Sequence, residues 1–254
     1  MRKTIKLPAP QLSQLQEVDI DLDMTGRHYA LLATSEGAIP EDVALSILKD
    51  LMEQDANKLT ISELRYLFML VKINSLENNY TVELKCTHDG KDGKPCGHIN
   101  TLKFHLSDAD LNRTPLKYKV PEIEFTIDKT TKTYKVMPPT MNMESALINY
   151  FLNDLGVKYE DISEDKTVAM KFTFIRSVMH LVDDKGQFII NNVEQFKIID
   201  SYLDVNKYQT VTDLYAKCEE VDGFGVQDKI YEMRCKECGG RLAYQLPLLH
   251  GLVS

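Results

Sequence analysis

The spacing of apolar residues predicts strands at the start of the chain. Apolar and polar residues alternate over 18–24, as in a strand with one buried face. The stretch 27–34 is expected to form a second short strand. We therefore expect residues 1–38 to be an extended arm with short strands.

The apolar spacing becomes helical after this arm. Pro40 suits the first turn of a helix, and Val43, Ile47 and Leu51 recur at the three-to-four-residue spacing of one helix face. A second helix is expected to begin at Thr60, because the segment "TISE" forms a capping box. Residues 39–80 are thus expected to form a helical pair.

Strands and helices then follow in separate blocks. Residues 81–140 are expected to hold a hairpin with cysteines at its tip and a second β-hairpin, and 141–223 to be entirely helical. In that helical insert, Gly156 is expected to end one helix, and Asn192 with Gln195 to cap another. The short connections between these helices favour a compact antiparallel bundle.

A last cysteine hairpin closes the chain. Residues 224–254 contain "RCKECGGRLAYQL", an alternating segment interrupted by two cysteines. The predicted fold class is therefore α+β: split zinc-ribbon-like β-hairpins with a helical bundle inserted between them, and an N-terminal strand and helix region.

Composition narrows the class of protein. The chain has 254 residues, 43% of them hydrophobic, and no apolar run near the ~20 residues that span a membrane. The N-terminal segment lacks the apolar region of a secretory signal, so we expect a cytosolic site of synthesis and no membrane association. Net charge is −8, whereas nucleic-acid binding usually requires a basic surface; we expect protein partners and no nucleic acid.

The two cysteine hairpins resemble each other. Each has an apolar residue, a basic residue, a cysteine, a loop, then a Cys-Gly pair and an alternating strand. Facing each other, they would offer the four thiolates of a tetrahedral zinc site: Cys86, Cys96, Cys235 and Cys238. Nine residues separate the first pair, which is longer than the usual two to four.

Alternatives to this ligand set remain open at this point. The hairpins could carry free thiols, or His88 or His98 could replace a cysteine, with Asp89 and Asp92 also in the first loop. A redox role for the second pair fits less well, because a strand rather than a helix follows it. Cys218 has the spacing of a buried helix residue.

The sequence offers little sign of catalysis. A site closed by four thiolates has no open position for water, so the predicted zinc is structural. Phosphate-binding, hydrolase and metalloprotease motifs are absent from the sequence, and His180 has the setting of a satisfied helix histidine. We therefore expect no enzyme. The apolar segment 246–254 is expected to dock on its own domain or on a neighbour.

Together, several segments resemble a known family. A helical pair, "LKC…CGHINTLKFHL", "EIEFTIDKTTKTYKVMPP", a helical insert and "RCKECGGRLAYQLPLL" are similar to the baseplate hub assembly proteins of T4-like contractile-tailed bacteriophages. The resemblance spans residues 40–254 and matches the four cysteines above to the family's metal-binding positions. The nine-residue loop departs from the family's closer spacing.

The resemblance implies a non-enzymatic assembly protein. Its partners would be other baseplate, hub and tape-measure proteins, and a homo-oligomer within the baseplate is compatible with it. The protein would be assembled in the host cytoplasm and reside in the virion baseplate. A zinc-ribbon regulatory protein that binds nucleic acid or polymerase is the alternative.

Overall fold

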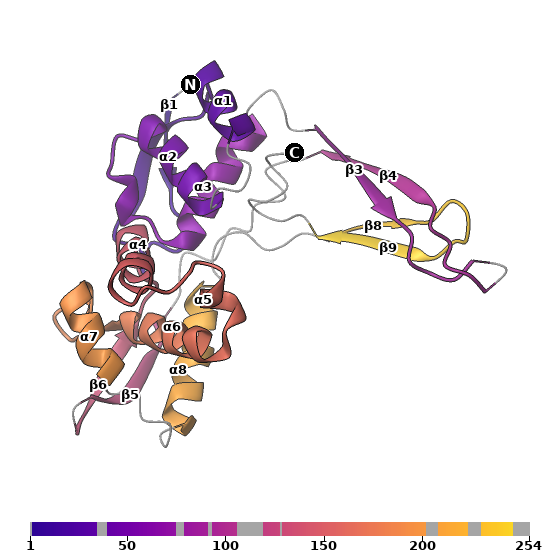
Figure 1. The fold of residues 1–254 in the computed structure, drawn as a ribbon. Coiled ribbons are helices and arrows are strands. Elements are labelled where there is room, and N and C mark those ends of the chain that lie inside the picture. Colours follow the sequence, from indigo (N-terminus) through magenta and orange to yellow (C-terminus); the bar gives the residue numbers. More distant parts are fainter. Residues whose placement is uncertain are drawn as a thin grey trace.

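The computed structural model has an α+β fold, as expected, with helices and small antiparallel sheets (Figure 1). The residues that it describes are 2–34, 40–74, 79–90, 93–105, 119–127, 129–201, 208–222 and 230–245. The apolar segment 246–254 lies outside them. Among the described residues, no helix is long and apolar enough to cross a membrane.

An N-terminal core combines a hairpin with helices. Its elements are β1 (Arg2–Lys6), β2 (Glu17–Asp21), α1 (Gly26–Thr34), α2 (Pro40–Leu51), η1 (Ala56–Lys58, a 3-10 turn) and α3 (Ile61–Asn74). The predicted alternation is confirmed, because Val18, Ile20 and Leu22 are buried in the same cluster as α2 and α3. The strands of the arm therefore contribute to a core.

The second strand expected in the arm is wrong. Residues 27–34 belong to the helix α1, which buries His28 and Leu32 one turn apart. The Thr25 amide donates a hydrogen bond to Nδ1 of His28 at 3.0 Å and so closes the first turn. In so short a stretch, apolar spacing does not separate a strand from a helix with two buried positions.

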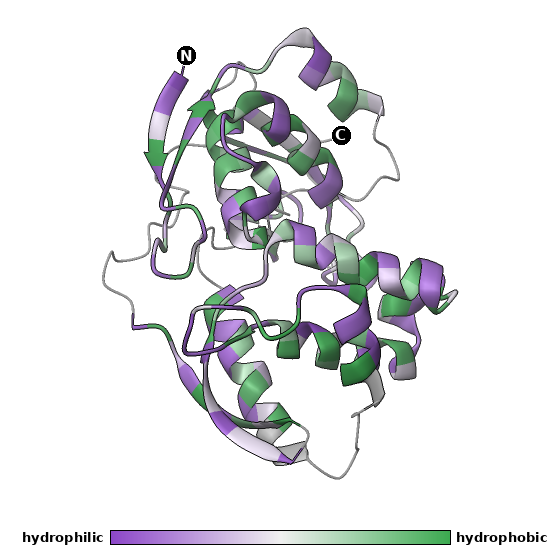
Figure 2. Ribbon diagram, turned by 90° about the vertical axis from the view of Figure 1, so that its left-hand side faces the viewer, coloured by the Kyte–Doolittle hydropathy of each residue, from purple (hydrophilic) through white to green (hydrophobic). Residues whose placement is uncertain are grey.

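A second core surrounds a three-stranded sheet. Its elements are β5 (Glu122–Ile127), β6 (Thr130–Val136), α4 (Met141–Asn149), η3 (Tyr150–Asp154, a π-helical turn), α5 (Asp161–Glu164), α6 (Lys166–Met179), β7 (Leu181–Val182), α7 (Val193–Ser201) and α8 (Tyr208–Asp222). The strand order is β5-β6-β7. The helices show bands of hydrophobic and hydrophilic colour in Figure 2, as expected for elements that bury one side.

The predicted all-helical insert is corrected by β7. Leu181 and Val182 pair with the edge of β6, and Val182 also bridges to Phe188. A buried pair of apolar residues directly after a helix gives no alternation to detect, so the strand is set by its tertiary partner. The predicted helix ends are confirmed: Gly156 has a φ of 65°, and Asn192 caps α7 through the Gln195 amide.

A partly buried charge network connects the helices of the second core. The Arg176 guanidinium binds Glu144 of α4 at 2.7 Å and Asp222 of α8 at 2.7 Å. His180 is fully buried; its Nδ1 donates to the Arg176 carbonyl at 2.9 Å, and Nε2 lies 3.1 Å from Asp222. His180 is thus the satisfied helix histidine that the sequence predicts. Cys218, also buried as expected, donates to the Ser177 carbonyl.

The cysteine hairpins form a separate small unit, which we call the cysteine module. It consists of β3 (Asn79–Lys85), β4 (Ile99–His105), β8 (Ile230–Arg234) and β9 (Arg241–Gln245), with the loops between the paired strands. In Figure 1 the two hairpins lie side by side and project from the helical body. The five-part division of the chain at residues 38, 80, 140 and 223 stays a prediction.

Candidate metal centre

Buried and exposed residues alternate along the strands, so each hairpin has one face that is turned toward the other hairpin. In β4, Leu102 and Phe104 are partly buried, whereas Thr101, Lys103 and His105 at the alternate positions are exposed. The inward faces of the two hairpins meet, and the rings of Phe104 and Tyr231 stack with centroids 4.1 Å apart. Phe104, Tyr231 and Tyr244 also pack against the N-terminal core. The aromatic ends of the hairpins therefore tie the cysteine module to the body.

The first cysteine loop has a defined backbone geometry. The Cys86 amide donates to the His98 carbonyl at 2.9 Å, and the Gly97 amide donates back to the Cys86 carbonyl at 3.1 Å. Gly97 has a φ of 65°, in the left-handed region that favours glycine. The backbone thus turns tightly behind the second cysteine.

The second cysteine loop repeats these bonds. The Cys235 amide donates to the Gly240 carbonyl at 2.8 Å, and the Gly239 amide donates to the Cys235 carbonyl at 2.9 Å. Gly239 has a φ of 77°. In both loops the first cysteine therefore bonds to the residue two positions after the second cysteine.

The nine-residue spacing of the first pair does not disturb this geometry. The extra residues continue the hairpin: Asp89 bridges to Pro95, and the Cys96 amide donates to the His88 carbonyl at 2.8 Å. The two cysteines are consequently brought back side by side at the neck of the longer loop.

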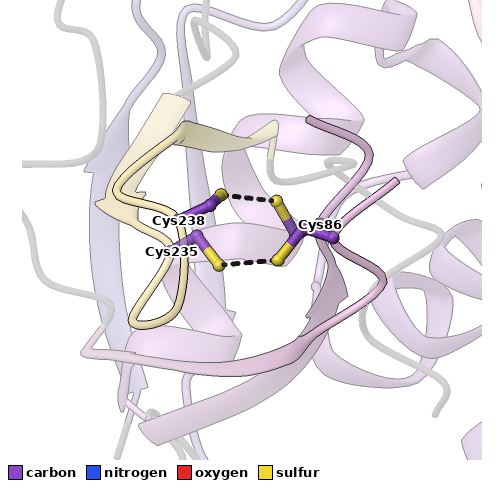
Figure 3. A group of neighbouring side chains, drawn as sticks. Cys86, Cys235 and Cys238 are labelled. Carbon is purple, nitrogen blue, oxygen red and sulfur yellow. Dashed lines mark hydrogen bonds between the residues drawn. The ribbon is translucent and has the colours of Figure 1, made fainter. Parts of the chain in front are cut away.

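The four predicted cysteines come together at one point. Their sulfur atoms all lie within 4.8 Å of one another. Across the hairpins, Sγ of Cys86 lies 3.5 Å from Sγ of Cys238 (Figure 3). Sγ of Cys96 lies 3.8 Å from Sγ of Cys235. A tetrahedron with Zn–S bonds of about 2.3 Å has sulfur atoms about 3.8 Å apart. The cluster has the size and the donor set that a zinc ion requires.

The surroundings of the cluster are apolar and poor in other atoms that could bind a metal. Cys86, Cys235 and Leu242 are buried, with Leu84 and Met233 packed against them. His88 lies nearby, its Nδ1 3.8 Å from the Cys86 sulfur, but the group of mutually close ligand atoms among the described residues consists of the four thiols. His98 contributes its backbone carbonyl, which accepts a hydrogen bond from the Cys86 amide. Asp92 lies outside the described residues.

Hydrogen bonds make the sulfur atoms unequal. The backbone amide of Cys238, aided by the side chain of Asn100, lowers the pKa of Cys235 to about 6. Burial raises the pKa of Cys86 to about 12. Of these two thiols, Cys235 therefore ionises more readily. A divalent cation would then displace the protons from the remaining thiols, because the thiolate is the form that binds metal.

The site includes a residue that the sequence analysis missed. Asn100 of β4 is buried and donates from Nδ2 to the Cys235 sulfur at 3.4 Å. The signal that could have identified it is a polar residue at an inward position of an alternating strand. Chemically, four thiols in an apolar setting can hold a soft or borderline cation, and four protein ligands leave a tetrahedral ion no open position.

The architecture and the thiol cluster together define an α+β protein with a candidate structural metal centre. The chain belongs to the family of T4 bacteriophage base plate proteins, whose model matches residues 16–241, and the four cysteines lie within this range. Neither a curated protein nor a solved structure gives a significant match. The resemblance seen in the sequence is thereby confirmed at the level of the base plate family. Membership implies a structural role in the virion tail and contacts with other base plate proteins.

Proposed function

We propose that this protein is a non-enzymatic assembly component of the baseplate hub, stabilised by a structural zinc ion. It acts through contacts with hub and tape-measure proteins and binds no nucleic acid. The observation that carries this proposal is the convergence of four thiols within 4.8 Å in a chain that belongs to a base plate family.

The proposed ligands are Cys86, Cys96, Cys235 and Cys238. Support comes from the sulfur separations, which match a tetrahedral site, and from the repeated backbone bonds of the two loops. The two loops would then act as one zinc ribbon whose halves are 138 residues apart in the sequence. In this split ribbon the ion joins two hairpins that lie far apart in the sequence.

The metal is tested by elemental analysis of the purified protein. We expect one zinc per chain, and Cys235→Ser should reduce the zinc content to near zero. Cys218→Ala is the matched control, because this fifth cysteine lies in the second core and binds no metal in our proposal. Full zinc content in Cys235→Ser would show that the ligand set is wrong.

The assembly role is tested in infected cells. We expect deletion of the gene to block formation of complete baseplates, and a tagged protein to copurify with base plate components. Infectious particles produced at the normal level without the protein would contradict the proposal. Detection of the tagged protein in purified baseplates would indicate a permanent component, and its absence from them would indicate a transient assembly factor.

A regulatory protein that binds nucleic acid is the second candidate. One observation favours it: the described part of the cysteine module has six basic and four acidic residues, against the overall charge of −8. Retention of the protein on DNA or RNA at low salt that weakens steeply as salt rises would support this role. We expect no retention.

A further inference from the structure

Asn100 occupies a position that the twin hairpin fills with leucine. Asn100 lies four residues after Cys96, and Leu242 lies four residues after Cys238. Both side chains are buried beside the cysteine cluster. An amide in an apolar site is unfavourable unless its hydrogen bonds are made, so this replacement requires an explanation.

Both polar ends of the Asn100 amide are used, and two of its bonds cross between the hairpins. The Nδ2 group donates to the His98 carbonyl at 3.2 Å and to the Cys235 sulfur at 3.4 Å. The Oδ1 atom accepts a hydrogen bond from the Lys236 backbone amide at 3.0 Å. One side chain of the first hairpin thus fixes both a sulfur atom and the backbone of the second cysteine loop.

In a second contact, a side chain of the first hairpin again packs against the backbone of the second. The His88 ring, also from the first hairpin, lies against Gly240 so closely that a Cβ there would be 2.7 Å from the ring. The first hairpin therefore reaches over the second at two points. Glycine at 240 leaves the room that this approach needs.

We propose that Asn100 is a positioning residue of the metal centre, which orients Cys235 through an N–H···S bond and holds the Lys236 backbone in register. This inference rests on the proposed zinc site. Groups that hydrogen-bond to a metal ligand fix its orientation, and their loss typically weakens metal binding by about 10–100-fold. Through Asn100, the first hairpin fixes the conformation of the second cysteine loop.

Two variants separate the parts of this role in the full-length protein. Asn100→Asp keeps an acceptor for the Lys236 amide but removes the donor to the sulfur. Asn100→Leu removes both and copies the apolar residue of the twin hairpin. Thr101→Ala, at the neighbouring exposed position of β4, is the matched control. Circular dichroism verifies that each variant is folded.

Two measurements are made on each protein. The first is the affinity for zinc in competition with a chromophoric chelator. The second is the thiolate-to-metal charge-transfer band after substitution with Co²⁺. A hydrogen bond stabilises the sulfur lone pairs, so its loss should move this band to lower energy. A residue that only fills space would not shift the band.

We expect both Asn100 variants to bind zinc about 10–100-fold more weakly than the control, with a shifted cobalt band. Wild-type affinity and an unshifted band in Asn100→Asp would overturn the positioning role while leaving the zinc site intact. A wild-type protein that binds neither zinc nor cobalt would instead overturn the zinc site and this inference with it.

Discussion

The helical body and the cysteine module are stabilised in different ways. Each of the two large cores is built from many buried apolar side chains contributed by several elements. The cluster in the cysteine module has three buried residues, and two of them are cysteines. Two-stranded hairpins are marginally stable by themselves, because they bury too little apolar surface. In this module, the four clustered thiols occupy the place of a hydrophobic core.

Removal of the zinc ion proposed above should have the largest effect, and that effect should be confined to the cysteine module. Structural zinc in small domains contributes about 10 kcal/mol or more to folding. We expect a chelator to abolish amide-exchange protection in the four strands of the module and to leave α3 and α6 protected. Loss of protection throughout the chain would show that the body also depends on the ion.

A cavity made in the second core should have the opposite effect: it should destabilise the helical body and leave the cysteine module unchanged. Phe151 is fully buried and meets Phe172 edge to face. Phe151→Ala should lower the free energy of unfolding of the body by about 3–5 kcal/mol, measured by denaturant titration. The zinc content should remain at one per chain. A loss of zinc in this variant would mean that the two regions fold as one unit.

Alkaline pH should weaken the body through His180. Burial opposes its charge, but the hydrogen bond to Asp222 prevails and raises the pKa of His180 to about 9. A raised histidine pKa gives stability that is complete below the unfolded value of about 6.5 and is lost as pH rises through about 9. We expect a loss of about 3 kcal/mol between pH 6 and pH 10.

His180→Gln is the control for that pH dependence. It should be less stable than the wild type at pH 7 and nearly level over the same interval. Equal slopes in the two proteins would show that another group titrates. The measurement is the midpoint of urea denaturation at each pH, with intact zinc verified in parallel.

The last expected effect is a gain in stability rather than a loss, and it lies in the N-terminal core. Glu63 accepts from the Thr60 amide at 2.9 Å, which confirms the predicted capping box, but its burial raises its pKa to about 7. A raised carboxyl pKa means that stability is greatest below about pH 4.5 and falls as pH rises to 7. Glu63→Gln keeps an acceptor without the charge, so we expect about 3 kcal/mol more stability at pH 8 and little change at pH 4. A variant that is equally destabilised at both pH values would contradict this account.

The clustering of the four cysteines could be predicted from the sequence because both hairpins carry the same local signature. A cysteine pair followed by glycine and an alternating strand identifies a loop without any knowledge of its partner. Likewise, the helix ends at Thr60 and Asn192 depend on side chains within the same turn, as the structure shows. Patterns of this kind depend on residues close in sequence.

What the sequence did not reveal depends on distant partners. The strand β7 exists because β6 offers an edge, and α1 is recognised only once its two buried residues have a core to face. Asn100 contacts a loop 135 positions further along the chain. A single sequence gives no sign of such a pairing, and a buried polar residue in a strand can equally be a satisfied core residue.

The separation of the two cysteine loops along the sequence also sets the order in which they are synthesised. The first loop leaves the ribosome 138 residues before Cys235. At about 5–20 residues per second, the first two thiols wait roughly 7–28 seconds for the second pair. During synthesis the body can fold while the module is still open. A chain that stops before Cys235 would never close its module, so the completed thiol cluster marks a chain that has been translated through both cysteine loops.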